Sequence, residues 1–462
     1  MNLIIILSFI IFFSFLYTKF FYHKIIFIII PLLILVFYFL IVNKNMLQLS
    51  VDYSLDNLHF VDLNHICYSL RHYKLDLDEK FLDATYDLSI YKNKIYSYFG
   101  ITPVLLFFLP FNLITNQYLN YRILSFIIMC LIFLVSILLF ENLIKICDND
   151  NKGKKVIIVH ILSVFLIGIT PILSIWYSVY SLEVMVSILL VFLSIYILSL
   201  YFIFPKKIFI FLLSVSLALS VGARPQNVFI IPAFFIVLMY YDYSTKELKQ
   251  VMRNAILFLI PCVVYGSLLA IYNYLRFDSI FEFGYWYMPV HSDFSFDFEK
   301  LLNGIYYSFF SFPGINYETF FSIKNNLPNA NIYEIEGIVG IIYMQPMILC
   351  LLLFPFFYKN KKFLYLIFLL VVIVLVNSII TNISAISIRY NIEYSLIMQV
   401  FALAMFICLY QKINNRILSY LTLTLFIVIY IYSIFINLSI CFHYSSLNYD
   451  LNNELLSFLL KI

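Results

Sequence analysis

Charged side chains are scarce in this sequence. Asp, Glu, Lys and Arg make up 12% of the 462 residues, whereas hydrophobic residues make up 63%. Globular proteins in water carry about a quarter charged residues, so a chain of this composition could not cover its surface with polar groups. A water-soluble globule is therefore excluded, and a polytopic membrane protein is predicted.

Glycine and paired cysteines are also sparse. There are 10 glycines and no GxxxxGK[ST] stretch, which argues against a chain that uses ATP directly. The seven cysteines form no CxxC or CxxH pair, so neither a zinc site nor a disulfide framework is expected. The net charge is only +4 and no basic run occurs, so a nucleic-acid partner is not expected.

Long apolar runs are what the sequence has in abundance. A helix needs about 20 apolar residues to cross the hydrocarbon core of a membrane. Runs of about that length predict an all-α polytopic protein with about twelve transmembrane helices, at 2–20, 25–42, 121–145, 156–176, 183–204, 208–223, 226–241, 254–276, 337–357, 362–380, 390–410 and 417–440.

The short connections that carry Lys and Arg predict the orientation, because such loops stay in the cytoplasm. Six basic connections place both chain ends outside, with residues 1–16 kept as a helix rather than cleaved as a signal peptide. Residues 101–115 are apolar but short and contain two prolines, which predicts a re-entrant or juxtamembrane helix on the outer face. We expect one integral membrane domain, 1–462, with outer loops at 43–120 and 277–336 and an outer tail at 441–462.

Acidic residues gather in the first outer loop. Eight of the 25 carboxylates lie between residues 43 and 100. Asp56 begins a loosely helical stretch, and an Asp in that position is a common N-cap. The alternative is a catalytic general base whose pKa is raised by partial desolvation at the membrane surface, with Asp52 as the second candidate.

Three histidines follow closely, His59, His65 and His72. His65 and His72 are seven residues apart, which places them on one face if the stretch is helical. A metal site is one interpretation, and surface histidines at the headgroup boundary are the other and more common one. His59 lies three residues from Asp56 and is kept as a substrate-binding candidate.

Charged residues also stand at the predicted outer ends of the spans. They are Glu183, Arg224, Arg276, Glu282 and Arg389. Ionisable groups at membrane depth are costly and usually face a cavity or a partner. Arginine is suited to bidentate phosphate contacts, so the three arginines are predicted to bind an anionic lipid phosphate. The simpler alternative is that they reach headgroup phosphates by snorkelling.

The order of these stretches resembles bacterial polytopic glycosyltransferases of the GT-C superfamily, related to dolichyl-phosphate-mannose-protein mannosyltransferases. The resemblance is carried by LDNLHFVDLNHICYSLRHYKLDLD at 55–78 with YDLSIYKNKIYSYFGITPVLLFFLPFNLIT at 86–115, GARPQNVFIIP at 222–232, YNYLRFDSIFEFGYWY at 272–287 and SIRYNIEY at 387–394. The most specific pieces are YNYLRF with FEFGY and IYSYFG with the prolines that follow.

The resemblance implies an inverting sugar transfer from a polyprenyl-phosphate monosaccharide to a glycan, lipid or protein acceptor. It implies a bacterial inner membrane with the active site on its outer face, in contact with membrane lipids. Asp56 would be the base, while the arginines would stabilise the departing lipid phosphate. Some relatives use a divalent cation, Mg²⁺ or Mn²⁺, and others do not. The chain departs from the pattern in lacking an adjacent acidic pair in its first loop.

Other functions stay open from the sequence. An outer-face polysaccharide polymerase is also polytopic, with arginines in its outer loops, but it would not need the 101–115 segment. A lipid-linked sugar flippase or another transporter would carry repeats and polar residues at mid-membrane. A structural scaffold would leave the clustered acids and the outer arginines unexplained.

Overall fold

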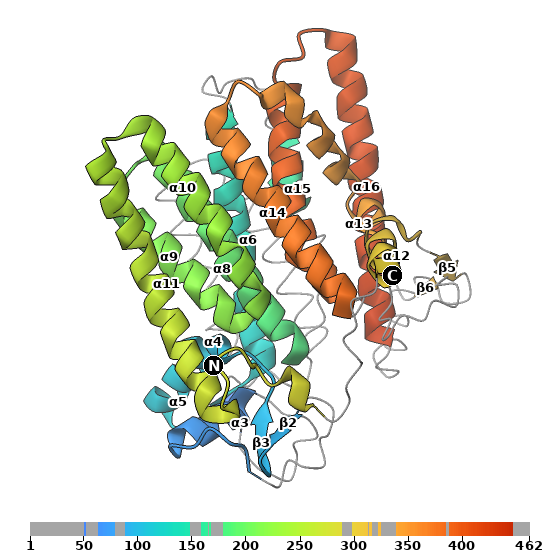
Figure 1. Ribbon diagram of the computed structural model, residues 1–462. Helices are drawn as coiled ribbons and strands as arrows, with labels where there is room; N and C mark the ends of the chain where they lie inside the picture. The colour runs from blue at the N-terminus through green and yellow to red at the C-terminus, as the bar shows by residue number, and fades with distance from the viewer. Residues whose placement is uncertain are drawn as a thin grey trace. The chain divides into compact units, whose positions relative to one another are not determined.

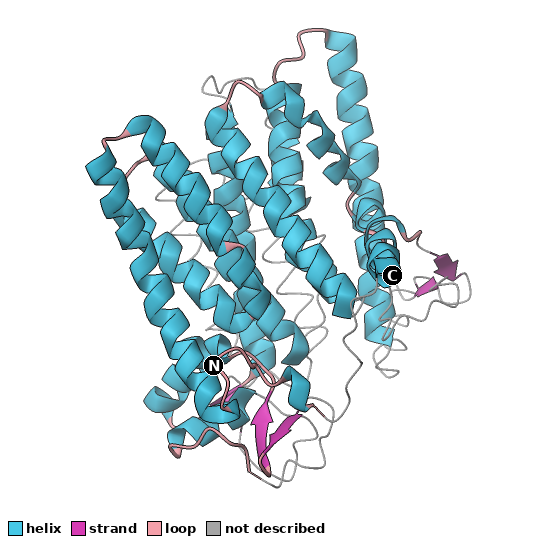
Figure 2. Cartoon of the chain, viewed as in Figure 1, coloured by secondary structure: helices cyan, strands magenta, loops and turns pink. Residues whose placement is uncertain are grey.

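The protein is described here by a computed structural model, shown as a ribbon in Figure 1 and by secondary structure in Figure 2. The described residues are 50–51, 63–78, 88–147, 159–164, 166–167, 179–288, 298–312, 314–316, 322–324, 339–384 and 388–446. They fall into two compact units. Unit 1 draws on 1–47, 129–176 and 296–462, and unit 2 on 48–128 and 177–295.

Seven helices in the described part of the chain are long and apolar enough to cross a membrane. They are Tyr121–Cys147, Leu182–Ile203, Pro225–Thr245, Leu248–Phe277, Lys361–Ile380, Tyr390–Tyr410 and Arg416–Asn437. Helices satisfy their backbone hydrogen bonds internally, as a lipid environment requires. The chain is therefore a polytopic, mainly helical membrane protein.

The predicted count of twelve is not confirmed. The spans at 2–20 and 25–42 lie outside the described residues, and the span at 156–176 is described only at 159–164 and 166–167. The predicted span at 208–223 corresponds to a helix of 17 residues, which is shorter than the seven helices above. The predicted span at 337–357 is not one continuous helix, because it is divided at Gln345.

Unit 2 is built around four apolar helices. These are α8 (Val179–Ile203), α9 (Lys207–Ala223), α10 (Ile231–Thr245, preceded by the 3₁₀ turn η4, Pro225–Phe229) and α11 (Leu248–Phe277). Helix α9 packs against α8 and α11, and α10 packs against α11. Because α8 and α9 are joined by a short link, as are α10 and α11, consecutive helices run in opposite directions. The start of α8 and the ends of α9 and α11 therefore lie at one end of unit 2 (Figure 1).

Smaller elements gather at that end. They are β1 (Ser50–Val51), α3 (Leu63–Arg71), β2 (Leu88–Tyr91), β3 (Lys94–Ser97), α4 (Ile101–Pro103), the π-helical turn η3 (Val104–Phe108), α5 (Leu109–Thr115) and β4 (Tyr118–Leu119). Strands β2 and β3 form a hairpin in which Ser89 pairs with Tyr96, and β1 pairs with β4. The predicted all-α class fits the described part of the chain, in which these strand pairs are only two and four residues long.

The 101–115 segment is helical throughout, as predicted, and shorter than a span. Its α4, η3 and α5 pieces follow one another without a break, and the Leu109 N–H bonds the Val104 carbonyl in the π-helical turn. Pro110 lacks an N–H, so a widened turn beside it is the expected local response. Thr102 Oγ1 donates to the Leu219 carbonyl at 2.8 Å, which fixes α4 against α9. The re-entrant placement of residues 101–115 in a membrane stays a prediction.

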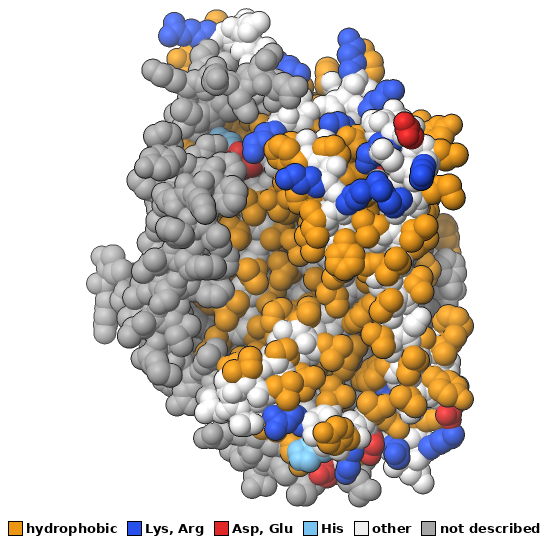
Figure 3. Space-filling model, turned by 90° about the vertical axis from the view of Figure 1, so that its left-hand side faces the viewer, with side chains coloured by type: hydrophobic (Ala, Val, Ile, Leu, Met, Phe, Trp, Pro, Cys, Tyr) orange, Lys and Arg blue, Asp and Glu red, His pale blue; other side chains and the backbone are white. Residues whose placement is uncertain are grey.

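The outward face of unit 2 is apolar. Side chains such as Ile236, Val263, Leu268 and Leu275 on α10 and α11 are exposed. Figure 3 shows this apolar surface as a band between two charged ends, with Lys and Arg more numerous at one of them. Exposed apolar area of this extent is expected where helices contact lipid chains.

Unit 1 holds the remaining helices. They are α12 (Phe298–Phe310), α13 (Ile341–Met344), the 3₁₀ helix η6 (Pro346–Phe357), α14 (Lys361–Ser384), α15 (Ile388–Tyr410) and α16 (Arg416–Ser446), with a strand pair β5 (Gly314–Asn316) and β6 (Ser322–Lys324). Helix α6 (Tyr121–Cys147) belongs to unit 2 up to Ile128 and to unit 1 beyond it. Helix α15 is the most buried span and packs against η6 and α14. Gln345 is non-helical because it precedes Pro346, which separates α13 from η6.

Candidate functional site

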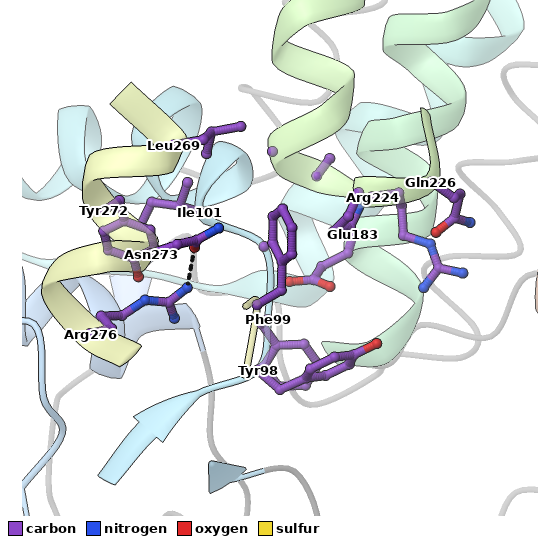
Figure 4. Close-up of a pocket in the computed structure, with 15 residues that line it drawn as sticks. Tyr98, Phe99, Ile101, Glu183, Arg224, Gln226, Leu269, Tyr272, Asn273 and Arg276 are labelled. Atoms are coloured by element: carbon purple, nitrogen blue, oxygen red, sulfur yellow. Dashed lines mark hydrogen bonds between the residues drawn. The ribbon is translucent and has the colours of Figure 1, made fainter. Parts of the chain in front are cut away.

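A small pocket lies at the end of unit 2 where α9 and α11 finish. Its volume is about 50 Å³, which is room for a few water molecules. Three of the residues predicted to bind substrate line it, one from each of three helix ends, as Figure 4 shows. The full lining is Tyr98, Phe99, Gly100, Ile101, Glu183, Gly222, Ala223, Arg224, Pro225, Gln226, Leu269, Tyr272, Asn273, Arg276 and Phe283.

Arg224 reaches the pocket because helix α9 ends at Ala223. Arg224 precedes Pro225, and a residue before proline is pushed out of the helical region. Its backbone is extended, with φ −139° and ψ 107°. The half-buried Arg224 side chain thus leaves the helix end at the break between two apolar runs.

Arg276 lies in the last turn of α11 and is only 4% exposed. Its guanidinium donates to the Ser97 carbonyl at 3.0 Å and to Asn273 Oδ1 at 2.9 Å. The Tyr272 ring lies 3.9 Å away, in cation–π geometry. In the part of the chain that the structure describes, no carboxylate forms an ion pair with Arg276. The direct contacts of the Arg276 guanidinium are thus all with neutral groups.

Glu183, from the first turns of α8, is 6% exposed. Figure 4 shows the Phe99 ring between Arg276 on one side and Glu183 with Arg224 on the other. The Arg224 guanidinium lies beside Gln226 and is directed away from Arg276. The pocket therefore has two cationic sides rather than one point on which all the arginines converge.

The β2–β3 hairpin contacts both Arg276 and the loop after α11. Ser97 at the end of β3 accepts from Arg276, and Ser89 Oγ on β2 donates to the Gly284 carbonyl at 2.7 Å. The Tyr91 ring packs on Tyr287, with centroids 4.6 Å apart. The hairpin thereby orders both Arg276 and the loop after α11.

Gly100 allows the close backbone approach beneath the pocket. A Cβ at this position would clash with the Gly222 carbonyl and would come within 2.6 Å of the Ala223 carbonyl oxygen. Gly100→Ala is therefore expected to lower the free energy of unfolding by about 1–3 kcal/mol, because the backbones must separate. Thermal unfolding of the purified protein in detergent measures this.

Gly266 provides the matched control on α11. A Cβ there meets nothing within 4 Å, so Gly266→Ala should leave the unfolding temperature unchanged or raise it. If Gly100→Ala and Gly266→Ala lower the unfolding temperature equally, the close backbone approach at Gly100 does not cause the loss of stability.

An exposed ionic contact joins the hairpin to the end of α11. Lys92 Nζ pairs with Asp278, and the Tyr91 hydroxyl donates to Asp278 Oδ2 at 2.9 Å. These two hydrogen bonds, that from Lys92 first, hold the pKa of Asp278 below its usual range.

The hairpin contact should therefore depend on pH. A lowered carboxyl pKa adds stability above the unfolded value of about 3.9, and this is lost as the pH falls through the folded pKa. Hydrogen exchange at 88–97, corrected for intrinsic rates, should speed up modestly from about pH 5 to about pH 3, because the pair is exposed. Asp278→Asn should remove that dependence, and its persistence in the variant would assign it to another group.

The other predicted residues fall in different places. Glu282 Oε1 accepts the Gly284 N–H at 2.6 Å, so Glu282 orders its own loop and is not part of the pocket lining. Arg389 is the second residue of α15 in unit 1, and its side chain lies outside the described residues. Asp52, Asp56 and His59 also lie outside them, so their roles stay predictions.

The histidine prediction needs a correction. His65 is buried within α3, at 1% exposed, whereas His72 follows the end of that helix and is exposed. His65 is therefore not a surface residue, whereas His72 is. Burial lowers the pKa of His65 to about 4, so it is neutral near pH 7.

No metal centre is found in the described ranges, where no three His, Cys, Asp or Glu side chains group closely enough to hold an ion. Asp52 and Asp56 lie outside those ranges, so the use of a divalent cation stays a prediction. Pocket residues that the sequence did not single out are Phe99, Gln226, Tyr272 and Asn273. Aromatic residues and asparagines are common throughout this sequence, so these four residues can be identified only from their neighbours in the structure.

Comparisons with known proteins give little. No protein family and no curated protein matches the sequence. Among solved structures, the chain is similar to the archaeal oligosaccharyltransferase AglB from Archaeoglobus fulgidus, in complex with an inhibitory peptide and a dolichol-phosphate. The match has 13% identity and a TM-score of 0.46, and it covers 90% of this chain but only 56% of the archaeal one.

Proposed function

We propose that this chain is an inverting membrane glycosyltransferase of the GT-C type. It takes a sugar from a polyprenyl-phosphate donor and transfers it to a glycan, lipid or protein acceptor on the outer face of a bacterial inner membrane. The sequence stretches that resemble this superfamily support the proposal. So does the pocket, which joins two arginines and a carboxylate at one end of lipid-facing helices.

The observation that carries the proposal is that Arg276 is buried with only part of its hydrogen-bonding capacity used. A guanidinium has five N–H donors, and Arg276 uses two of them on a carbonyl and an amide oxygen. Burying a charge without a counterion is costly, so such a cation is kept where a ligand brings the opposite charge. A phosphate suits it, since its oxygens accept charge-assisted hydrogen bonds from arginine.

In the proposed reaction, the Asp56 carboxylate takes the proton of an acceptor hydroxyl while the hydroxyl oxygen attacks the anomeric carbon. The bond from that carbon to the lipid phosphate oxygen breaks, and the phosphate leaves with its negative charge. Arg276 binds the departing phosphate, and Arg224 adds positive charge on the other side of the pocket, so the developing negative charge is stabilised. Asp52 is the alternative base. His59, Glu183, Glu282 and Arg389 are the further substrate-binding candidates.

The test is mass spectrometry of surface glycans and lipid-linked sugars from cells without the gene, with it restored, or with Asp56→Asn. We expect one defined sugar to be lost, its polyprenyl-phosphate donor to accumulate, and Asp56→Asn not to rescue, because an amide cannot accept the proton. Asp62→Asn, the same change in the same loop, is the matched control and should rescue fully.

Other outcomes would contradict the proposal. Accumulation of complete repeat units with unchanged composition would indicate a polymerase or a flippase. Full rescue by Asp56→Asn would remove Asp56 as the base and move the role to Asp52.

A further inference from the structure

Three aromatic rings lead outward from the pocket. Tyr98 lines the pocket, its ring centroid lies 6.2 Å from that of Tyr285, and Tyr285 lies 5.7 Å from Trp286. Trp286 is 58% exposed. These three residues, here called the aromatic row, lead from the pocket to the surface of unit 2.

The row is held in place by its own loop and by the hairpin. Glu282 Oε1 accepts the backbone N–H of Gly284 and, more weakly, that of Trp286 at 3.4 Å. Gly284 has φ +104°, a conformation that favours glycine, and its carbonyl accepts from Ser89. The ring faces are therefore largely fixed before any ligand arrives, which lowers the entropic cost of binding.

The chemistry of such a row suits a saccharide. Faces of tyrosine and tryptophan carry partial negative charge, and the C–H groups on the flat side of a sugar ring carry partial positive charge. The tyrosine hydroxyls add donors and acceptors for sugar hydroxyl groups. A donor phosphate bound at Arg276 would hold its sugar, through the bond from a phosphate oxygen to the anomeric carbon, in the pocket that Tyr98 also lines.

We propose that Tyr98, Tyr285 and Trp286 form the binding subsite for a saccharide acceptor. The inference rests on the proposed function and deepens it, because it selects a glycan among the three acceptor classes. The acceptor hydroxyl would approach along the row toward the anomeric carbon of the donor.

The competing explanation is membrane anchoring, since tryptophan and tyrosine gather at membrane interfaces. The surroundings of the row favour the saccharide. The Trp286 N–H donates to the Glu282 carboxylate, and Lys92 of the hairpin that packs on the loop forms an exposed ion pair with Asp278. The row therefore lies among charged groups, which suit an aqueous ligand better than lipid chains. Phe281 on the same loop is 84% exposed and is not part of the row or of the pocket lining, so it is a natural comparator.

Fluorescence of Trp286 tests the location without any transferase assay. Trp176 is the only other tryptophan, so Trp176→Phe leaves Trp286 as a single reporter. In lipid nanodiscs we expect quenching by acrylamide in the water and little quenching by brominated acyl chains. Strong quenching by the brominated chains would overturn the inference in favour of an anchor.

Acceptor kinetics test the role. In isolated membranes, with the donor and the acceptor glycan identified by the mass spectrometry above, Trp286→Ala should raise the acceptor KM about three- to tenfold, the size of one lost aromatic contact. The kcat and the Kd for farnesyl phosphate should not change, Trp286→Phe should restore most of the loss, and Phe281→Ala should behave as wild type. An unchanged acceptor KM in Trp286→Ala, or an equal effect of Phe281→Ala, would overturn the subsite.

The two proposals fail in different ways. If wild-type membranes transfer no sugar and lipid-linked donors do not change on deletion, the proposed function fails. If transfer occurs but the acceptor KM does not respond to Trp286→Ala, only the aromatic subsite fails.

Discussion

Asn273→Asp is expected to reduce the affinity of the protein for farnesyl phosphate about a hundredfold, without loss of the fold. Asn273 Oδ1 already accepts from Arg276, and Asn273 is 1% exposed. A carboxylate there would keep that hydrogen bond and turn it into a buried ion pair. The counterion would then be part of the protein, and the phosphate would have to compete with it.

Two variants separate this effect from simpler ones. Asn273→Ser shortens the side chain and removes the amide oxygen that accepts from Arg276, but adds no charge, so the affinity should fall only about tenfold, the loss of one hydrogen bond. Gln226→Glu adds the same charge on the Arg224 side of the pocket (Figure 4). If the two charged variants lose equal affinity, net charge alone explains the result, and Arg276 has no special part in phosphate binding. Isothermal titration with farnesyl phosphate in detergent, together with unfolding temperatures, gives both readouts.

The sequence was a good guide to the ends of the helices. Glu183, Arg224 and Arg276 were selected because charges at the ends of apolar runs are costly, and the structure places all three around one pocket. Alternating directions of consecutive helices bring such ends together, so this part of the site follows from counting spans. The assigned roles of the three residues stay predictions.

The hairpin could not be foreseen in the same way. In IYKNKIY at 90–96, apolar and polar residues do alternate weakly, but the Lys92–Asn93 turn lacks glycine and the whole chain is rich in tyrosine and isoleucine. Both turn residues have positive φ; Asn93 favours this conformation, but Lys92 does not, so the signal for a turn is weak. The contact of Arg276 with Ser97 joins residues 179 apart, and no local pattern predicts it.

One missed feature did have a signal. The predicted span at 337–357 contains Pro346 and Pro355, and the residue before proline is driven from the helical region. The structure divides the segment at Gln345 accordingly. Hydropathy averages over such breaks, so the number of spans is less predictable than the positions of the apolar runs.

A second large effect is expected at Asp242, near the opposite end of α11 from the pocket. Asp242 is fully buried on α10, where it accepts from Tyr201 at 2.7 Å and from Asn254 at 2.6 Å. Lys246 Nζ lies 2.7 Å from Asp242 Oδ1. The cluster therefore ties α8, α10 and α11 together with every carboxylate oxygen occupied.

Asp242→Ala is expected to lower the free energy of unfolding by about 3–5 kcal/mol. The lost attraction matters less than the cation that remains, since Lys246, with a side chain only 15% exposed, would lose its counterion and keep only the hydroxyl and ring of Tyr201. Tyr201 and Asn254 would lose an acceptor as well. Reversible unfolding in mixed micelles measures the change.

The double variant Asp242→Leu with Lys246→Met removes both charges and should recover much of the lost stability, because a buried ion pair can often be replaced by apolar side chains of similar size. If the double variant is as unstable as Asp242→Ala, the hydrogen bonds of Tyr201 and Asn254 matter more than the charges. Asn254 and Arg276 are 22 residues apart on α11, a distance of about 33 Å along the helix. Farnesyl phosphate should therefore bind the folded fraction of either variant as it binds the wild type, which separates a site that holds unit 2 together from the pocket that holds the ligand.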